Sequence, residues 1–389
     1  MPATPKDPLD TSGSQDVTAD ASLPLIGVVG AGVMGTGIAQ LALEAGHEVI
    51  LHDVDDTALS RARDRIVDGL GRRAVKVVDG DAVDDWIAER IVRLRETDVL
   101  EMVGDAADVV IEAALESLDL KRTIFGTLDG VADPGAIFAT NTSALSVGAI
   151  AAASRWPERV LGLHFFNPAP VMRLVEVVAT DRTDPAVVER ATQLVESWGR
   201  TAVRSADRPG FIVNRVNRPF TIESLRMLEE AAATVEQIDD AMRDGGFPLG
   251  PFELMDLTGL DVTTAAATTI WEGLGRPERL RPSRIQAELV AAGRLGRKTG
   301  EGFYRYADGR RTAVSDRFAG PRTDLAGAGI RDRIESAIAA EARLAVAEGV
   351  ASAADVDRAL RLGAGHPHGP FEGADAAGDA ADNAGTHRG

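Results

Sequence analysis

The sequence of 389 residues contains no cysteine and only six histidines. The absence of cysteine excludes disulfide bonds, catalysis by a thiolate, and zinc or iron–sulfur sites built on cysteine, and it is typical of cytoplasmic proteins. The histidines show no HExxH or other spacing of metal ligands, which argues against metal catalysis. We therefore expect a cytoplasmic protein without a metal site.

The sequence also lacks long apolar runs and blocks of positive charge. No apolar stretch approaches the roughly 20 residues that span a bilayer, and residues 1–21 do not resemble a secretory signal. The formal net charge is −18, and no Lys/Arg block or interleaved aromatic run is present, which argues against nucleic-acid binding. We expect neither a nucleic acid nor a membrane as a partner, although a local group of cations could still bind an anionic ligand.

A glycine-rich stretch, GAGVMGTG at Gly30 to Gly37, lies between an apolar strand pattern and a helical pattern, and a second apolar strand pattern ends at Asp53. This order is that of a dinucleotide-binding βαβ unit. In such a unit Gly30 permits the tight turn, Gly32 lets the backbone approach a pyrophosphate, and Gly35 lets helix and strand pack closely. Asp53 would accept hydrogen bonds from ribose hydroxyls and would repel a 2′-phosphate. The sequence therefore predicts NAD rather than NADP as cofactor.

Residues 160–178 contain two apolar strand patterns, each with one polar residue that does not suit a core. The connecting Asn167-Pro-Ala-Pro excludes a helix between them. A buried carboxylate at Glu176 costs several kcal/mol unless it is paired, and His164 is an available partner. The pair is either a general base with its orienting carboxylate, or a core histidine and a strand glutamate that reaches solvent at a sheet edge.

Two further stretches each have two interpretations. Asn141 to Ser143 follow an apolar strand pattern, so they are either ligand-binding residues at the carboxyl end of a parallel strand or the N-cap of the next helix, with Ser143 or Ser146 as the cap. From Asp55 to Val103 the pattern is helical, polar and charged. Its basic residues, among them Lys76, form either a solvated helix face or a basic surface for an anionic ligand.

Changes in pattern predict the domains. Residues 1–22 have little to bury and are expected to be a disordered tail. Residues 23–206 alternate between strand and helix patterns, which predicts an α/β Rossmann-type NAD-binding domain. After a break at Asp207-Arg-Pro-Gly, residues 207–306 follow helical patterns, which predicts an all-α domain.

Part of the helical region recurs near the end of the sequence. Residues 235–253 align with 353–372, with one more residue in the second copy's bend, and the helical patterns that precede them also align. We therefore predict a linker at 307–328, a second, degenerate and partial copy of the all-α module at 329–375, and another disordered tail at 376–389.

Six motifs together resemble those of the L-3-hydroxyacyl-CoA dehydrogenases, the 3-hydroxybutyryl-CoA dehydrogenase group included. They are GAGVMGTG with Asp53, NTS at 141–143, GLHFFNPAPVMRLVEVV, RPGFIVNR, GFPLGPFELMDLTGLD and GRKTGEGFYRY, and they extend from about residue 25 to residue 306. The resemblance implies NAD-dependent, reversible oxidation of an L-3-hydroxyacyl-CoA to the 3-oxoacyl-CoA. This reaction serves fatty-acid metabolism and β-oxidation, polyhydroxyalkanoate and butyrate metabolism, and aromatic-acid degradation through 3-hydroxyadipyl-CoA, and the sequence does not distinguish among them. Alternative substrates are a hydroxyacyl group on a carrier protein and a free hydroxy acid.

The resemblance also implies roles for single residues. His164 matches the general base and Glu176 the carboxylate that orients it. Ser143 matches a hydroxyl that binds the C3 oxygen, and Asn214 an amide that polarises the thioester. The implied cofactor-binding residues are Gly30, Gly32, Val33, Met34, Gly35, Asp53, Glu116, Lys121, Asn141, Asn167 and Lys298, and those for the CoA substrate are Lys76, Ser143 and Asn214.

The repeated helical module also bears on the oligomeric state of the protein. It resembles the longer family members that carry two C-terminal domains, but Asp332 stands at the position of Asn214 and GFIVNR is lost, so the second copy should be catalytically silent. Members with one such domain commonly dimerise through it. The chain is therefore expected to be a homodimer, or an internal pseudo-dimer in which the two copies pack on each other.

Overall fold

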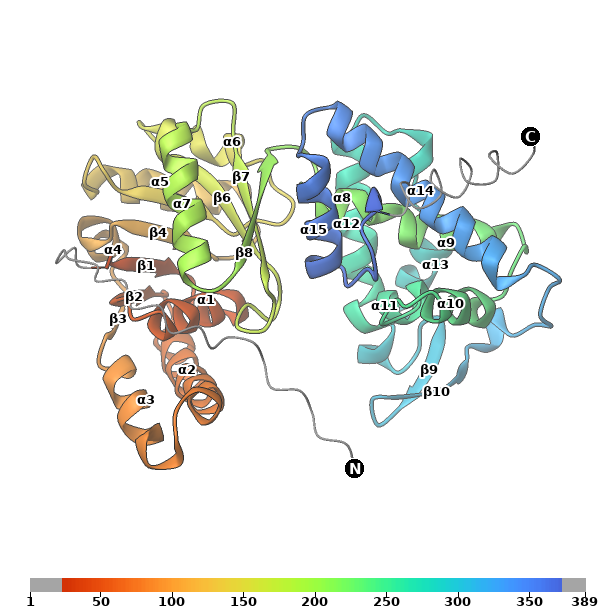
Figure 1. Cartoon of the computed structure of the whole chain (residues 1–389), viewed down its shortest axis with the longest axis horizontal. Helices are drawn as coiled ribbons and strands as arrows, with labels where there is room; N and C mark the ends of the chain where they lie inside the picture. The colour runs from red at the N-terminus through yellow and green to blue at the C-terminus, as the bar shows by residue number, and fades with distance from the viewer. Residues whose placement is uncertain (1–22, 373–389) are drawn as a thin grey trace, which may run out of the picture.

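The computed structural model describes residues 23–372, so the tails expected at 1–22 and 376–389 lie outside the described residues. Figure 1 shows two bodies side by side, an α/β domain in red to yellow-green and a helical domain in green to blue. The last strand of the first domain ends at Ala206, and the first helix of the second begins at Val213. Among the described helices, none has both the length and the apolar character of a membrane span.

The α/β domain contains an eight-stranded sheet in the order β3-β2-β1-β4-β5-β6-β7-β8. All neighbouring strands are parallel except β6 and β7, which are antiparallel. The order reverses direction between β1 and β4, which is where ligands bind in doubly wound sheets. The strands are β1 (Ile26–Val29), β2 (Val49–His52), β3 (Leu94–Thr97), β4 (Val109–Glu112), β5 (Ile137–Thr140), β6 (Val160–Phe165), β7 (Leu174–Ala179) and β8 (Thr201–Ala206).

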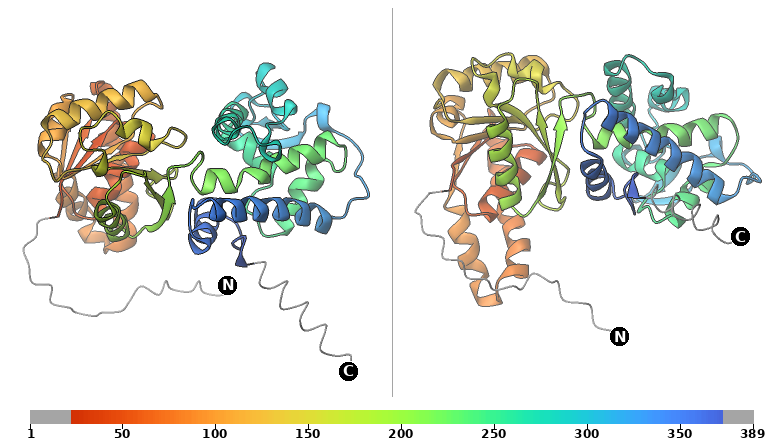
Figure 2. Two further views of the ribbon diagram at one scale, coloured as in Figure 1. Left: turned by 90° about the horizontal axis from the view of Figure 1, so that it is seen from above. Right: turned by 45° about the horizontal axis from the view of Figure 1, so that its top comes forward.

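Helices cover both faces of this sheet. Apolar side chains of α1, α2 and α7 pack on one face, and those of α4, α5 and α6 pack on the other. The helices α2 and α3 extend together beyond the sheet, as the right view of Figure 2 shows. The bounds are α1 (Val33–Glu44), α2 (Asp56–Val77), α3 (Val83–Ile91), α4 (Leu100–Ala106), α5 (Leu118–Val131), α6 (Val147–Ala151) and α7 (Pro185–Ser197).

The expectation of continuous helical pattern from Asp55 to Val103 is wrong at β3. This strand has the sequence LRET and buries only Leu94, so it carries no alternating apolar pattern. It pairs with β2 as the edge strand of the sheet. Its conformation is set by those backbone hydrogen bonds rather than by its side chains, and a local pattern therefore could not reveal it.

The second domain is helical but contains one β-hairpin, which corrects the prediction of an all-α domain and a plain linker. The hairpin joins β9 (Tyr304–Ala307) to β10 (Arg310–Val314) through Asp308 and Gly309, both at positive φ, as a tight two-residue turn requires. The helices are α8 (Val213–Val216), α9 (Arg218–Glu229), α10 (Val235–Asp244), α11 (Pro251–Thr258), α12 (Leu260–Gly273), α13 (Arg284–Ala291), α14 (Gly327–Ala347) and α15 (Ala353–Gly363).

The two C-terminal helices complete the core of the second domain. Apolar side chains of α14 and α15 belong to the same buried cluster as those of α9, α10 and α11. Helix α15 lies between the two domains in Figure 1, and a Cβ added at Gly363 would meet Leu174 of β7 at 2.6 Å and Val213 of α8 at 3.0 Å. The Ala206 N–H also donates to the Val350 carbonyl over 2.8 Å. The C-terminal segment thus contacts both domains next to the site described below.

Candidate active site

The glycine-rich loop after β1 has the shape that a bound pyrophosphate needs. Gly30 has φ +105°, and a Cβ there would lie 2.7 Å from the Ala113 carbonyl oxygen. A Cβ at Gly35 would lie 1.8 Å from the Gly30 carbonyl oxygen. Gly32 is the N-cap of α1, and among the described residues no atom comes within 4 Å of a Cβ built there. The space beside Gly32 at the start of α1 is therefore open among the described residues, and the loop fits a dinucleotide phosphate.

Asp53 stands at the carboxyl end of β2, beside this loop. One of its carboxylate oxygens accepts a hydrogen bond from the Ala31 N–H over 2.7 Å, and the other accepts one from the Asp55 N–H over 3.1 Å. These bonds hold the carboxylate against the glycine-rich loop, where it can still accept from the hydroxyls of a ribose. The position fits NAD for the reason that the sequence indicates.

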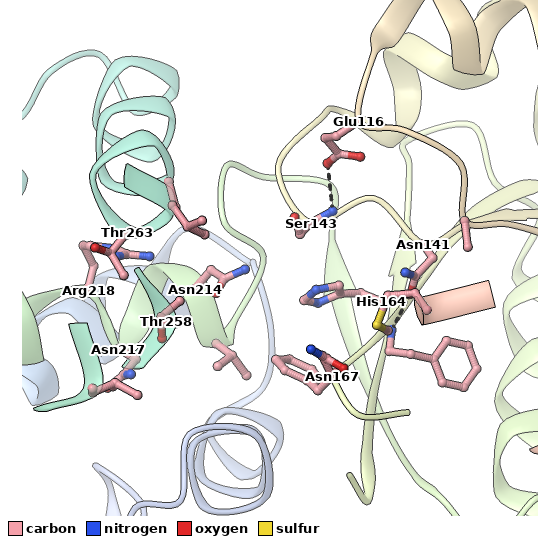
Figure 3. Close-up of a pocket in the computed structure, with 18 of the residues that line it drawn as sticks. Glu116, Asn141, Ser143, His164, Asn167, Asn214, Asn217, Arg218, Thr258 and Thr263 are labelled. Carbon is pink, nitrogen blue, oxygen red and sulfur yellow. Dashed lines mark hydrogen bonds between the residues drawn. The ribbon is translucent and has the colours of Figure 1, made fainter. Parts of the chain in front are cut away.

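A cavity of about 570 Å³ opens between the two domains. Figure 3 shows side chains of both domains pointing into it, with His164 near its middle. It brings together eight of the residues singled out in the sequence, namely Met34, Glu116, Lys121, Asn141, Ser143, His164, Asn167 and Asn214. Residues of one motif alone could not form this site, because Asn214 comes from the helical domain and the others from the α/β domain.

His164 and Glu176 face each other on the antiparallel strands β6 and β7. The His164 Nδ1 and the Glu176 Oε2 are 2.5 Å apart. The other Glu176 oxygen accepts hydrogen bonds from the N–H groups of Ile212 and Val213, over 3.0 and 2.8 Å, at the start of α8. These three partners explain why a fully buried carboxylate is tolerated. The alternative of a glutamate that reaches solvent at a sheet edge is wrong, because β7 lies between β6 and β8.

A network around Glu116 shapes the loop that carries Ser143. The Glu116 carboxylate accepts hydrogen bonds from the Thr142 hydroxyl over 2.6 Å and from the Ser143 N–H over 3.1 Å. Burial alone would raise the pKa of Glu116, but the Thr142 hydroxyl and the charge of Lys121 lower it overall. Lys121 itself is buried and lies 2.7 Å from Glu112. Glu116 is therefore ionised and orders the loop.

Of the two residues that the sequence offers as the N-cap, Ser146 has that role and Ser143 does not. Ser146 caps α6 by accepting from the Ala149 N–H over 3.2 Å. The Ser143 hydroxyl has no hydrogen-bond partner among residues 23–372 and lines the cavity. Ser143 thus remains available to a ligand beside His164.

The remaining predicted residues differ in position. The Asn141 side-chain oxygen accepts from the Phe165 N–H over 2.8 Å, which orients the amide at the cavity wall. Val33 is exposed at the start of α1. Lys76 is exposed in the last turn of α2 and does not line the cavity. Lys298 also lies outside the cavity, where it pairs with Asp261 at 2.6 Å. Contact of Lys298 with the cofactor stays a prediction.

The sequence interpretation found Asn214 but missed the three other polar residues on the same face of α8 and α9. Asn217, Arg218 and Thr221 line the cavity together with Asn214, and the spacing of three and four residues is that of one helical face. Thr258 and Thr263 line the same side (Figure 3). A search for polar residues at helical spacing inside an otherwise apolar segment would have found this face.

Models of one protein family match both domains of the chain. The sequence matches the model of the 3-hydroxyacyl-CoA dehydrogenase NAD-binding domain over residues 25–208, and that of the C-terminal domain of the same family over residues 210–306 and again over 330–387. The C-terminal match is thus split into two segments. Together the two models cover most of the chain.

Relatives share both sequence and fold. A 3-hydroxyadipyl-CoA dehydrogenase of Escherichia coli is 44% identical over 315 residues, which are 79% of this chain and 65% of that relative's length. A 3-hydroxybutyryl-CoA dehydrogenase of Mycobacterium tuberculosis is 40% identical over 285 residues, 72% of this chain and 98% of the relative. A crystal structure of 3-hydroxybutyryl-CoA dehydrogenase from Escherichia coli superposes with a TM-score of 0.81 at 36% identity, and covers 90% of this chain and 91% of that one.

Proposed function

Because the chain belongs to the 3-hydroxyacyl-CoA dehydrogenase family, we propose that it oxidises the 3-hydroxyl group of an L-3-hydroxyacyl-CoA reversibly, with NAD as the hydride acceptor. The observation that carries the proposal is the position of the hydrogen-bonded pair of His164 and Glu176. This pair adjoins a cavity that is lined both by the α/β domain and by Asn214 of the helical domain. A general base at this position could take a proton only from a ligand bound in the cavity between the domains.

His164 is the proposed general base. Glu176 accepts the hydrogen bond from the Nδ1–H of the imidazole, so that Nε2 carries a lone pair toward the cavity. When the substrate is oxidised, Nε2 takes the proton of the hydroxyl group. Bound NAD supplies the acceptor for the hydride that leaves C3. Glu176 stabilises the imidazolium that forms, without itself accepting the proton.

Ser143 and Asn214 are the proposed partners of the substrate's two oxygens. The free hydroxyl of Ser143 is available to the C3 oxygen, on which negative charge develops, and a fixed donor there lowers the barrier. Asn214 lines the cavity from α8, where its amide can donate to the thioester carbonyl. The approach of one domain to the other would assemble the four groups around the substrate.

We further propose that residues 329–375 are the second copy of the helical module of 207–306, and that its described part, residues 329–372, packs on the first copy as an internal pseudo-dimer. Reciprocal ion pairs support this proposal. Arg215 lies 2.8 Å from Glu341 and 2.7 Å from Glu348. In the sequence alignment Arg333 corresponds to Arg215, and it lies 2.7 Å from Glu223 and 2.8 Å from Glu230, the counterparts of those two glutamates.

The bends of the two copies support the same relation. Phe247 and His366 occupy equivalent positions, and their rings contact each other at 4.8 Å between centroids. Asp239 in the first copy accepts from the Phe252 N–H over 2.9 Å, and Asp357 in the second accepts from the Phe371 N–H over 2.9 Å. A homodimer built from both copies remains the alternative, and light scattering separates them. A mass near 41 kDa supports the pseudo-dimer, and twice that mass supports the homodimer.

The test of the proposed activity is spectroscopic. NADH oxidation with acetoacetyl-CoA should be fast, and should be much slower with a free 3-oxo acid or with NADPH. A carrier-protein-bound oxoacyl group that reacts faster than the CoA thioester would favour the alternative substrate. Absence of turnover with every 3-oxoacyl-CoA would contradict the proposal.

A further inference from the structure

Arg218 is a cation without an anion in the wall of the cavity. It is the first residue of α9 and lines the cavity from the helical domain. Among residues 23–372, no side chain forms an ion pair or a hydrogen bond with its guanidinium, and its Nε is buried without a partner. Figure 3 shows it beside Thr263, on the side of the cavity away from His164. From this arrangement we propose that Arg218 is the residue that binds a carboxylate at the far end of the acyl chain. It would thereby select 3-hydroxyacyl-CoA thioesters of dicarboxylic acids, the kind of substrate in the name of the 44%-identical relative from Escherichia coli.

The charge balance of the cavity supports an anionic ligand group. Glu116 is the one acidic residue among the lining residues of the described chain, and it is already paired with Lys121 at 3.3 Å. The half formed by the helical domain has Arg218 and no acid. Burial lowers the pKa of Arg218 to about 10, so that it is still charged at neutral pH. A buried charge without a partner is unfavourable, and an entering carboxylate removes that cost.

Neighbouring residues provide further hydrogen-bond donors. The Asn217 side-chain oxygen lies 2.8 Å from the His366 Nε2, which leaves the Asn217 amide nitrogen for the cavity. Leu254, Val262 and Ala266 line the same half with apolar surface, which suits the methylene groups of an acyl chain. The helical half of the cavity therefore offers an apolar wall that ends at cationic and amide groups.

A terminal carboxylate fits Arg218 better than the phosphates of CoA. One guanidinium matches one carboxylate through two parallel hydrogen bonds. The phosphates of CoA carry several charges and require several cations or water. The exposed basic residues of α2, among them Lys76, offer such a surface outside the cavity, whereas Arg218 is a single cation in a half-enclosed wall.

This inference rests on the proposed function, and a matched pair of substrates separates the two. The probes are 3-hydroxyadipyl-CoA and 3-hydroxyhexanoyl-CoA, which have equal chain length and differ in the terminal carboxylate. The wild-type protein should have a kcat/KM at least about tenfold higher for the adipyl thioester. Arg218→Met should lower that ratio by about 10- to 100-fold, mainly through KM, because it removes a charge-assisted hydrogen bond. Arg218→Lys keeps the positive charge but cannot form two parallel hydrogen bonds with a carboxylate. Its ratio of kcat/KM values should therefore lie between those of the wild type and Arg218→Met.

The control is Arg276→Met, which removes an exposed arginine that is paired with Glu272 away from the cavity. It should leave the ratio unchanged. A second measurement avoids variants altogether: adipyl-CoA should inhibit the wild-type protein more tightly than hexanoyl-CoA does. Equal kcat/KM values for the two thioesters in the wild type, or an equal loss for both in Arg218→Met, would overturn the inference while leaving the proposed function intact. If neither thioester is oxidised, the proposed function itself fails.

Discussion

Glu176 of the α/β domain accepts a hydrogen bond from the backbone N–H of Val213 in the helical domain, over 2.8 Å. The same carboxylate holds the imidazole of His164 through its other oxygen. Val213 begins α8, whose next residue is Asn214. One buried carboxylate therefore links the proposed base to the backbone that carries the proposed thioester donor. The position of the helical domain and the orientation of the base depend on the same group.

Glu176→Gln should lower kcat by about 10³- to 10⁴-fold, by analogy with other base and carboxylate pairs. The glutamine can still accept from Ile212 and Val213 through its oxygen, but its NH₂ group would then face the His164 Nδ1. That contact favours the imidazole tautomer with a proton on Nε2, which cannot act as a base. Steady-state kinetics measures the loss, and circular dichroism checks that the fold is kept. A variant with kcat within threefold of the wild type would argue against the orienting role.

Asp53→Ala should weaken NAD binding by about 10- to 100-fold, since it removes the acceptor for two ribose hydroxyl groups. The KM for the acyl-CoA should change little, because Asp53 does not line the cavity. Fluorescence titration with NADH measures the affinity. Asp56→Asn is the matched control, as Asp56 is an exposed residue of the first turn of α2. Native preference for NADP would contradict the assignment of the ribose site.

The reciprocal ion pairs predict different losses of stability. Arg215 and Glu341 are both fully buried. Arg215→Met removes one of the two arginine partners of this carboxylate and leaves Arg279, 2.6 Å away, so it should cost about 1 to 3 kcal/mol. Arg333 is about one-third exposed (35%), so that Arg333→Met should cost about 1 kcal/mol or less. Denaturant unfolding of both variants tests the order. Equal losses would mean that burial does not distinguish the two pairs.

His366 should make stability depend on pH. Burial, and then the nearby charge of His368, lower the pKa of His366 to about 4 in the folded protein, against about 6.5 in an unfolded chain. Between these values the unfolded state binds a proton that the folded state does not. The stabilisation from neutral His366 is complete above about pH 6.5 and is lost as pH falls toward about 4, by up to about 3 kcal/mol.

The matched variant is His366→Phe, which places in the second copy the residue found at the equivalent position of the first, Phe247. The variant should lose this part of the pH dependence, so its melting temperature should fall less than that of the wild type between about pH 7 and pH 5. His47 and His52 of the other domain are unchanged in both proteins, and they cancel in the comparison. Identical pH profiles for the two proteins would refute the prediction.

The parts of the fold that the sequence predicts well are those fixed by local spacing. The glycines at 30, 32 and 35 and the acid at 53 identify a βαβ unit because turn, close packing and acceptor each require one residue type at one place. The sequence does not predict β3, because this strand has no apolar pattern. It does not predict the β9–β10 hairpin either, because the polar Asp308-Gly309 turn is typical of a linker as well. The pairing of an edge strand depends on the tertiary structure, so the local sequence does not reveal it.

The site is predicted in part for a similar reason. A carboxylate inside an apolar strand indicates that Glu176 has partners, and His164 was an evident one. The backbone N–H groups of Ile212 and Val213 could not be foreseen, since they come from a distant segment whose placement only the fold determines. The sequence does not point to Arg218, because a charged residue in a helix usually faces solvent. Only the position of the cavity in the folded chain distinguishes Arg218 from the other arginines on helix surfaces.

The most direct measurement of the central claim uses His164→Gln. If His164 is the general base of an L-3-hydroxyacyl-CoA dehydrogenase, kcat for 3-hydroxybutyryl-CoA with NAD should fall by about 10²- to 10⁴-fold, while the affinity for NADH stays within about twofold, because His164 is not one of the phosphate- or ribose-binding residues. A variant that retains near-normal turnover with this substrate would contradict the account.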